Sequence, residues 1–436
     1  MIRRDRRTYG QDNTASSAPL SIAYVVWRFP QLSETFILNE ILFLKKAVPG
    51  LRVTIFSIRR PVLQQTHPHV AELAAEILYA PLLPALGALL RAVVARLPVL
   101  KEQWRQMMRE TGAMRAGGLR LGIKRLAKQA HYLLCAIAFL PQLHRRGCRH
   151  IHAHYAHGAG VIARTMSALF GIPYSLTTHA HDLYQNANPN RIIDLHRRAA
   201  FAVTISHYNR IHIASLDAML YDKIHVIHCG VDCERLTPSG PAANAAPLLR
   251  ISTIARLVPI KGIVETIDAL AELAGKVDYT YTIAGYGQLE PHIRRLINHR
   301  NLEHRIFLRG PQDSGSVRNI LAETDLFVLF CQQSPDGNRD GIPVALMEAM
   351  ACGIPVISTR LSAIPELVKN GCGILVEPGD TQGLRNAIRE VAHMPVEQRI
   401  EMGRRGRTII EREFDIRKET EKLARLFLNR AAAAHA

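Results

Sequence analysis

Two acidic residues, Asp340 and Glu348, are separated by seven residues in a stretch that reads DGIPVALMEAMACGIPVIST. Proline suits the first turn of a helix and glycine suits its end, so this stretch predicts a helix from about Pro343 to Ala351 that stops at Gly353. Glu348 would lie one to two turns inside the helix, and Asp340 in the loop before it. Ionised carboxylates in such positions can accept hydrogen bonds from pairs of adjacent hydroxyl groups.

The loop before this helix is suited to phosphate. Backbone N–H groups around Gly341 and Ile342, at the positive end of the helix dipole, can bind the oxygens of a diphosphate. The alternative is structural, with Glu348 on a solvated helix face and Asp340 in an ordinary turn. Apolar and small residues surround Glu348, however, and a charge in that company usually has a partner. The pattern therefore favours a sugar nucleotide.

Two basic residues, Arg256 and Lys261, follow the strand-like run RISTIA, and a glycine pair, Gly285 and Gly287, follows the run YTYTIA. Because ligands bind at the carboxyl ends of parallel strands, we expect Arg256 and Lys261 to lie near Gly341 as a positive clamp on a leaving diphosphate. They could instead be ordinary surface cations. The glycine pair lacks the third glycine of a dinucleotide-binding fingerprint, and it predicts a tight turn beneath a nucleotide.

His179 ends the strand-like run YSLTT, and His181 and Asp182 follow it on the same loop. A side chain at the end of a strand can reach a ligand cleft, so we expect His179 to take part in the site. The alternative is a buried structural histidine. We expect His181 and Asp182 to line the same loop.

Three further histidines, at positions 152, 154 and 157, raise the question of a zinc site. A strand places His152 and His154 on one face, but no further ligand or carboxylate is evident nearby, so we expect no metal there. The chain also lacks any Asp-x-Asp motif, which is the usual sign of a transferase that holds its diphosphate through a metal ion. We therefore expect a site without metal or cofactor, in which basic side chains and a helix end supply the positive charge.

These residues are set among two series of short strand-like runs that alternate with helix-length segments. The first series is SIAYVVW, LRVTIFSI, HIHAHY, YSLTTH, FAVTIS and KIHVIHC, and the second is RISTIA, YTYTIAG, RIFLRG, DLFVLF, IPVIS and GILVE. This alternation is typical of parallel sheets. We predict an α/β protein with two Rossmann-like, doubly wound domains that face a cleft.

Composition suggests the boundaries of these domains. The stretch Thr237–Leu248 is rich in Pro, Ala, Ser and Gly and has no charge, which suits a linker. The expected segments are a disordered basic arm at 1–20, an N-terminal domain at 21–236 with a basic helical insertion at about 82–148, a linker at 237–249, and a C-terminal domain at 250–415 followed by a helix at 416–436.

Charge and cysteine content narrow the class of protein. The formal net charge of the 436 residues is +18, and residues 91–150 hold thirteen Lys or Arg against two acids. No aromatic-rich or zinc-finger module accompanies this charge, so nucleic acid is not an expected partner. Seven scattered cysteines indicate neither a disulfide framework nor a zinc ribbon. No signal peptide is evident before the first strand, and we expect a cytoplasmic protein.

The basic insertion contains two apolar stretches, Leu82–Leu100 and His131–Leu143, which are too short or too interrupted to span a bilayer. Apolar faces that also carry Arg and Lys match an element that lies on an anionic leaflet. This interpretation would place the protein peripherally on the inner face of the cytoplasmic membrane. The alternative is an ordinary helical insertion packed on its own domain.

Several of these motifs together resemble family 4 of the retaining glycosyltransferases. The acidic stretch is similar to the acid-x7-acid signature of that family, RLVPIKG to its RLxxxKG, AGYGQLE to its AGxGxxE, and IHCGVD to its IxNGVD. Asp340 replaces the first Glu of the family pattern, and Cys229 replaces its usual Asn. FPQLSETFILNEI, HAHYAH and THAHDLY resemble a narrower group that builds exopolysaccharides, including colanic-acid-type transferases.

The resemblance implies a GT-B fold in which the C-terminal domain binds the donor, the N-terminal domain binds the acceptor, and the C-terminal helix crosses back to the first domain. It implies that Asp340 contacts the donor sugar, Glu348 the nucleotide ribose, and His179 the sugar near the reacting carbon. The remaining donor-site residues would be Gly341, Ile342, Pro343, Gly285 and Gly287, and the acceptor side would include Ser33, Glu34, Thr35, His181 and Asp182.

These observations predict a metal-independent glycosyltransferase that uses a UDP- or GDP-linked sugar, and the resemblance implies retention of anomeric configuration. The narrower resemblance implies an acceptor such as a polyprenyl-diphosphate-linked oligosaccharide or another glycan in exopolysaccharide biosynthesis. Two other classes are alternatives, namely a sugar-nucleotide epimerase of similar layout and a non-catalytic binder of membranes or nucleic acid. The broken glycine fingerprint disfavours a nicotinamide oxidoreductase.

Overall fold

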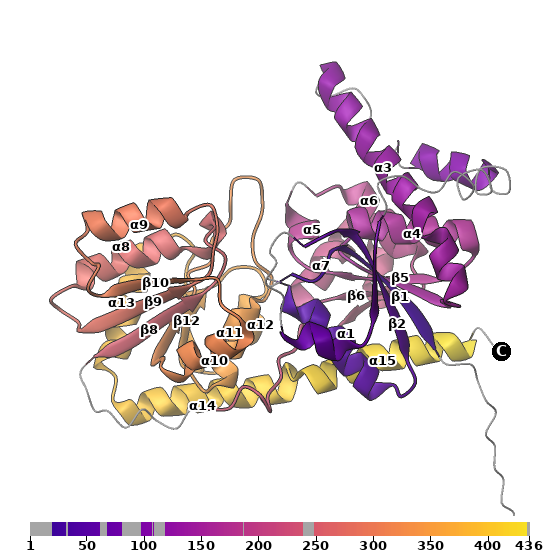
Figure 1. The fold of residues 1–436 in the computed structure, drawn as a ribbon. Coiled ribbons are helices and arrows are strands. Elements are labelled where there is room, and N and C mark those ends of the chain that lie inside the picture. The colour runs from indigo at the N-terminus through magenta and orange to yellow at the C-terminus, as the bar shows by residue number, and fades with distance from the viewer. Residues whose placement is uncertain are drawn as a thin grey trace, which may run out of the picture.

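The computed structural model describes residues 20–31, 34–61, 68–80, 97–106, 108, 118–185, 187–238 and 248–433. Within them the chain forms two parallel β-sheets with helices packed against them, and the two halves lie side by side (Figure 1). The predicted fold class, two doubly wound parallel-sheet domains, is confirmed. Ser33, nearly all of the predicted basic arm, most of the linker and most of Leu82–Leu100 lie outside the described residues.

The N-terminal sheet has the strand order β3-β2-β1-β4-β5-β6-β7. Its strands are β1 (Ser21–Arg28), β2 (Arg52–Arg59), β3 (Glu76–Tyr79), β4 (His150–His154), β5 (Tyr174–Thr178), β6 (Phe201–Thr204) and β7 (Ile224–Val226). All six predicted runs form strands. The edge strand β3 was not predicted, because four partly exposed residues are too few to show a periodic pattern. The direction of the strand order changes between β1 and β4, where ligands of such sheets bind.

Helices connect these strands. They are α1 (Thr35–Ala47), α3 (Gly118–Arg145), α4 (Gly158–Phe170), α5 (His181–Tyr184), α6 (Pro189–Arg198) and α7 (His207–Leu216), with short 3-10 helices η1 (Pro68–Leu73) and η2 (Ala218–Lys223). Tyr132, Phe139 and Leu143 on α3 are buried in the same core as the residues of α4. The apolar stretch His131–Leu143 therefore packs on its own domain. This is the arrangement expected of an ordinary helical insertion. Among the described helices, none has the length and apolar character needed to cross a membrane.

The C-terminal sheet has the strand order β10-β9-β8-β11-β12-β13. Its strands are β8 (Leu249–Ile254), β9 (Tyr279–Ala284), β10 (Ile306–Gly310), β11 (Leu326–Val328), β12 (Val356–Thr359) and β13 (Gly373–Val376). The helices are η3 (Pro259–Lys261), α8 (Ile263–Leu273), α9 (Glu290–His299), α10 (Ser314–Ala322), α11 (Val344–Ala351), α12 (Ile364–Leu367) and α13 (Thr381–His393). The change of direction lies between β8 and β11, which places the loops after both strands at the ligand edge.

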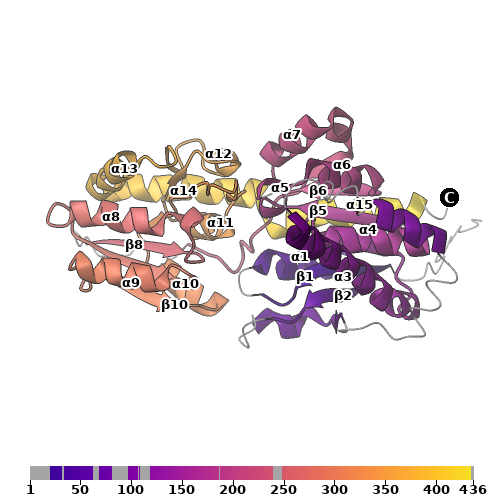
Figure 2. The ribbon, with the colours of Figure 1, turned by 90° about the horizontal axis from the view of Figure 1, so that it is seen from above.

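The last two helices, α14 (Val396–Glu413) and α15 (Ile416–Ala433), join the two halves (Figure 1, Figure 2). The helix α14 lies along the C-terminal half, while α15 packs on α1 of the N-terminal half. Leu423 and Phe427 on α15 are buried in the core that surrounds α1. At the junction Val231 N–H donates to the carbonyl of Phe414 at 2.9 Å, and Ile416 N–H donates to the carbonyl of Val231 at 3.0 Å. The chain between the domains is thereby attached to the helix that crosses back.

Candidate active site

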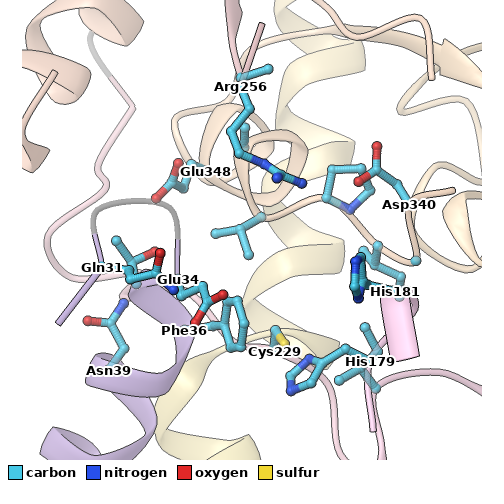
Figure 3. A pocket seen from close by; sticks show the side chains of 18 of the residues that line it. Gln31, Glu34, Phe36, Asn39, His179, His181, Cys229, Arg256, Asp340 and Glu348 are labelled. Atoms are coloured by element: carbon cyan, nitrogen blue, oxygen red, sulfur yellow. The ribbon is translucent and has the colours of Figure 1, made fainter. Parts of the chain in front are cut away.

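A cavity of about 870 Å³ lies between the two domains. Figure 3 shows side chains of both domains around it. The predicted site residues that line it are His179, Asp340, Arg256, Lys261, Glu348, Gly341, Ile342, Pro343, Gly285, Glu34, Thr35, His181 and Asp182. Gly287 is not among them, because it packs behind the loop, where a Cβ atom would lie 2.4 Å from the carbonyl oxygen of Leu257. The expectation that Gly287 contacts a ligand is therefore corrected to a role in the turn.

An ion pair lies on the C-terminal side of the cavity. Lys261 Nζ donates to Asp340 Oδ1 at 2.7 Å, and the Sγ of Cys331 lies 3.3 Å from Asp340 Oδ2. Arg256, on the loop after β8, points into the same cavity (Figure 3). Next to Asp340, the guanidinium of Arg339 lies 4.5 Å from the ring of Tyr184, which belongs to the N-terminal domain. In the loop before α11, the charge of Asp340 is thus balanced by Lys261 of the same domain. The neighbouring Arg339 contacts the N-terminal domain through Tyr184.

The start of α11 faces the cavity without a side-chain cap. Pro343 takes the N-cap position just before the helix, and no side chain accepts a hydrogen bond there. Within the described part of the chain, the N–H groups of Gly341 and Ile342 have no protein acceptor. The positive end of the helix and these N–H groups can therefore bind an anion. The helix predicted from Pro343 to Ala351 is observed from Val344 to Ala351.

Glu348 lies on the side of α11 that borders the cavity. Its neighbours Leu346, Met347, Ala349 and Met350 are all fully buried. Burial raises the pKa of the Glu348 carboxyl to about 7, because the surrounding apolar atoms disfavour the charged form. Hydrogen bonds from ligand hydroxyls would favour the carboxylate, so Glu348 can respond to a ligand near neutral pH.

Gly285 shapes the loop after β9. Its φ angle is +145°, and a Cβ atom at this position would lie 1.8 Å from the carbonyl oxygen of Ala255. Only glycine fits so close to another backbone. The approach lets Leu257 N–H donate to the carbonyl of Tyr286 at 2.9 Å, which holds this loop beside the one that carries Arg256. The predicted tight turn is therefore present beside the cavity.

His179 is a buried residue at the end of β5. Its Nε2 lies 3.1 Å from Nδ1 of His154, and the ring centroid of Phe36 is 4.7 Å away. Burial, and then the neighbouring histidines 154 and 157, lower the pKa of His179 well below its ordinary value. The neutral imidazole is therefore the stable form at the cavity wall.

A hydrogen-bond chain continues from His179 away from the cavity. His154 Nε2 lies 3.2 Å from Glu40 Oε1, and the hydroxyl of Tyr24 donates to the same oxygen at 3.0 Å. A carboxylate only accepts, so a singly protonated His154 donates from Nε2 and accepts at Nδ1. His179 then donates from Nε2, and its Nδ1 is left as an acceptor. Glu40 therefore decides the tautomer of His179 through His154.

The expectation that no carboxylate lies near the histidines of β4 is wrong. The ligand atoms of Glu40, His152 and His154 lie within 4.8 Å of one another, a spacing that could hold a metal ion. Each of these groups already has a protein partner, however. His152 uses Nδ1 with Ser175 Oγ at 2.8 Å and Nε2 with Thr177 Oγ1 at 3.0 Å. These hydrogen bonds are sufficient to explain why Glu40, His152 and His154 lie together.

Two acids lie on the N-terminal side of the cavity. Burial raises the pKa of Glu34, against the opposing effect of a hydrogen bond with Tyr155. Burial likewise raises the pKa of Asp182 to about 6. Its oxygens accept from the N–H groups of Ala156 at 2.6 Å and His179 at 3.0 Å. Asp182 thus joins the loops after β4 and β5 through these hydrogen bonds. Of the two carboxylates, that of Glu34 is the more available to a ligand.

Several residues that line the cavity were missed by sequence reasoning. Tyr155 directly follows β4, so the rule that ligands gather at strand ends could have identified it. Trp27 near the end of β1 could have been found in the same way. Lys128 and Arg191 lie on α3 and α6, and no local pattern signals that these helices reach the cleft.

Comparison with known protein families gives two matches. Residues 248–409 match the family described as Glycosyl transferases group 1, and residues 113–235 match the family described as Glycosyltransferase Family 4. The first match covers the donor-side cations and both acids of the C-terminal domain. The second covers the histidines of β4 and β5 and of the loops that follow them.

Solved structures with similar folds share the two-domain architecture. HepE from Anabaena, solved with UDP, aligns with a TM-score of 0.70 over 94% of this chain and 100% of its own, at 17% identity. Sucrose-phosphate synthase from Thermosynechococcus elongatus aligns with a TM-score of 0.69 over 95% of this chain and 100% of its own, also at 17% identity. At such identities the likeness concerns the fold alone.

Curated relatives are closer in sequence. The Escherichia coli protein named as colanic acid biosynthesis glycosyltransferase WcaL is 30% identical over 418 residues, which cover 93% of this chain and 99% of that protein. The amylovoran biosynthesis glycosyltransferase AmsK of Erwinia amylovora is 39% identical over 165 residues, which cover 37% of this chain and 40% of that protein. Because the first relative is matched over nearly its whole length and both family patterns describe glycosyltransferases, the chain belongs to family 4 of the glycosyltransferases and has their GT-B fold.

Proposed function

We propose that this glycosyltransferase moves a sugar from a nucleoside diphosphate to an acceptor hydroxyl without the help of a metal ion. One observation carries the proposal: Arg256, Lys261 and the uncapped start of α11 converge with Asp340 and Glu348 in a single cavity. Fixed cations and backbone N–H groups suit the negative charge that develops on a leaving diphosphate. Carboxylates beside them suit the hydroxyls of a ribose and a sugar.

The donor roles are those that the family resemblance implies, and the shared cavity supports them. Glu348 accepts hydrogen bonds from the ribose, Asp340 from the transferred sugar, and His179 lies across the cavity near the reacting carbon. HepE was solved with UDP and with UDP-glucose, which supports UDP as the leaving nucleotide here. A Corynebacterium glutamicum relative, 29% identical over 208 residues, is named as a GDP-mannose-dependent mannosyltransferase, which supports GDP as the second candidate.

The reaction retains the configuration of the transferred sugar. The bond between the anomeric carbon and the diphosphate oxygen breaks, and a bond to the acceptor oxygen forms on the same face. The acceptor proton passes to an oxygen of the leaving phosphate, so no protein base is needed. Lys261 already engages Asp340, which supports a binding role for this acid over that of a covalent nucleophile. NMR of the product tests this assignment, and an inverted anomeric centre would refute it.

The acceptor is a glycan of exopolysaccharide synthesis, carried on a polyprenyl diphosphate. The names of the colanic acid and amylovoran relatives support this assignment. Lys101, Arg105 and Lys124 of the basic segment 91–150 are exposed, and they would hold the enzyme at an anionic inner leaflet. Flotation with vesicles that contain anionic lipid tests the second point. Failure to float at low salt would disprove membrane attachment, because weak electrostatic binding is strongest there.

Membership of a glycosyltransferase family removes the two other classes that the sequence allowed. An epimerase would change the donor without an acceptor, and a non-catalytic binder would leave the convergent acids and cations without a purpose. Analysis of products after incubation with donor and acceptor separates transfer from both alternatives.

A thermal-shift panel of UDP, GDP and their sugars tests the donor site. A ligand at 100 times its dissociation constant should stabilise the protein by about 2.7 kcal/mol. We expect one nucleotide to give a shift that Lys261→Ala abolishes. Lys369→Ala is the control, because Lys369 pairs with Glu413 outside the cavity. The absence of a shift with every nucleotide would contradict the proposal.

A further inference from the structure

Cys331 lies directly behind Asp340, the acid on the donor side of the cavity. It follows β11 by three residues, and its side chain is fully buried and is not part of the described cavity lining. Its N–H donates to the carbonyl of Leu329 at 3.0 Å, and its carbonyl accepts from Thr359 Oγ1 at 2.9 Å. Thr359 is the last residue of β12, so the backbone of Cys331 is held at the edge of the sheet.

The thiol of Cys331 and the ammonium of Lys261 share the carboxylate of Asp340. Cys331 Sγ donates to Oδ2 at 3.3 Å, and Lys261 Nζ donates to Oδ1 at 2.7 Å. The torsion that turns an aspartate carboxylate has a broad minimum, so a donor on one oxygen leaves the carboxylate plane free to rotate. Two donors on different oxygens, from separate parts of the chain, fix that plane.

Backbone contacts hold the segments of these two donors together. The N–H of Gln332, the residue after the cysteine, donates to the carbonyl of Ile260, the residue before the lysine, at 2.9 Å. Gly262, the residue after the lysine, has a φ angle of +61°, and a Cβ atom there would overlap the carbonyl oxygen of Phe330. Only glycine allows so close an approach. The segments that carry the thiol and the ammonium are therefore fixed against each other.

The thiol of Cys331 is a donor at neutral pH. Burial, and then the charge of Asp340, raise the pKa of Cys331 well above its ordinary value, so the proton stays on sulfur. A buried cysteine can also act as a small apolar residue, and sulfur is a weak donor. The charged acceptor favours the polar role here, because hydrogen bonds to ionised groups are about twice as strong as neutral ones.

We propose that Cys331 is a positioning residue, which orients the carboxylate of Asp340 toward the transferred sugar before the donor binds. The inference rests on the proposed function, because that function assigns Asp340 to the donor sugar. A carboxylate has about four acceptor positions, and the thiol and the ammonium occupy two of them. The others remain for sugar hydroxyls, in directions that the two donors set. A carboxylate that is already oriented loses less freedom when the sugar binds.

Binding of a nucleotide with and without its sugar tests this role in the full chain. Asp340 is assigned to the sugar, so a disoriented carboxylate should weaken the binding of UDP-glucose and leave that of UDP unaffected. By calorimetry, we expect Cys331→Ala to bind UDP-glucose about fivefold more weakly and UDP within about twofold of the parent protein. Cys331→Ser keeps a donor and should restore most of the loss. GDP and GDP-mannose are measured as a second pair, which covers the other candidate base.

Cys372→Ala is the matched control. Cys372 is also fully buried, belongs to the same hydrophobic core as Cys331 and is not part of the described cavity lining. Its thiol donates to the backbone carbonyl of Leu367 at 3.9 Å. The control should bind each nucleotide and nucleotide sugar within about twofold of the parent protein. Thermal midpoints show that the variants are folded.

The S–H stretching band provides a second test that needs no ligand. The band lost in Cys331→Ala should lie at lower frequency than the band lost in Cys372→Ala, because a charged acceptor at 3.3 Å weakens the S–H bond more than a carbonyl at 3.9 Å. The Cys331 band should move to higher frequency in Asp340→Asn, whose neutral amide accepts more weakly. Infrared difference spectra measure both effects.

Three results would overturn the inference: an unchanged ratio of UDP-glucose to UDP affinity in Cys331→Ala, an equal change of that ratio in Cys372→Ala, or a Cys331 band no lower than that of Cys372. Equal weakness of Cys331→Ser and Cys331→Ala would also overturn it. If GDP-mannose is the donor that binds, the same outcomes apply to the second pair. Failure of the donor proposal looks different, because then neither nucleotide binds the parent protein, and the role of Cys331 is refuted with it.

Discussion

Lys261 Nζ lies 2.7 Å from Asp340 Oδ1, although the two residues are 79 positions apart in the chain. Their side chains are only 12% and 15% exposed, so each charge depends on the other for compensation. Loss of one partner of such a pair leaves an uncompensated charge, which typically costs about 3–5 kcal/mol when fully buried. The pair therefore stabilises the loop before α11, and both of its side chains line the cavity.

Asp340→Asn tests the acid of this pair. The amide can still accept from Lys261 but leaves the ammonium without a countercharge, so we expect a folded but less stable protein whose rate of transfer falls about 100-fold. Initial rates with saturating donor measure the effect. Asp336→Asn is the control, because Asp336 lies in the same loop and is exposed. Full activity of Asp340→Asn would show that the acid has no part in transfer.

Glu348 should make folding stability depend on pH. With a pKa of about 7 in the folded protein, it keeps a proton that the unfolded chain loses above about pH 4.5. Folding stability therefore falls as pH rises from about 5 to about 7. Glu348→Gln removes this effect, so its thermal midpoint should rise relative to that of the wild type between about pH 5 and pH 8. If the thermal midpoints of Glu348→Gln and the wild type differ by the same amount at every pH in that range, the raised pKa of Glu348 is wrong.

The same residue should make donor binding depend on pH. Ribose hydroxyls bind best to the carboxylate form, so the affinity of the wild type for UDP-glucose should increase about tenfold from pH 6 to pH 8. Glu348→Gln should bind more weakly and show little change. Calorimetry at both pH values measures this difference. An equal increase in the variant would place the titrating group elsewhere.

Glu40→Gln tests the hydrogen-bond chain behind His179. A glutamine can donate as well as accept, so it no longer forces His154 to donate from Nε2. We expect transfer to fall about tenfold with little change in the donor KM, because His179 loses its fixed tautomer. Tyr24→Phe is the matched control, since it removes the other hydrogen bond to Glu40 and keeps the carboxylate. Equal losses in both variants would indicate a purely structural role.

Phe427→Ala tests the helix that crosses back to the N-terminal domain. Phe427 is 2% exposed and packs edge-on against Phe201 and His152, with ring centroids 5.4 Å away in each case. Its removal should lower the free energy of unfolding by about 3–5 kcal/mol. Leu428→Ala, at a neighbouring position that is 46% exposed, should change it by less than about 1 kcal/mol. Denaturant unfolding of both variants measures the difference.

Local patterns were enough to predict most of the elements. Runs of β-branched residues identified all strands except β3, and proline and glycine marked the ends of α11 to within one residue. Such signals are local because they arise from backbone preferences and side-chain periodicity. Ligands bind at the carboxyl ends of parallel strands, and this rule predicted that Arg256, Lys261 and His179 would lie near the ligand cleft. All three line one cavity in the structure.

Contacts between distant segments depended on tertiary structure. Glu40 and His154 are 114 positions apart, and only the packing of α1 against the end of β4 makes them neighbours. Lys128 and Arg191 reach the cleft because of how α3 and α6 pack on the sheet, and Gly287 turned out to support a loop. The sequence by itself therefore determined the two doubly wound domains and the donor-side residues, because the strands, the helices and the loops between them follow from local rules. The tautomer of His179 and the presence of Lys128 and Arg191 at the cleft were decided only by the packing of helices, whose orientation depends on side chains far apart in the chain.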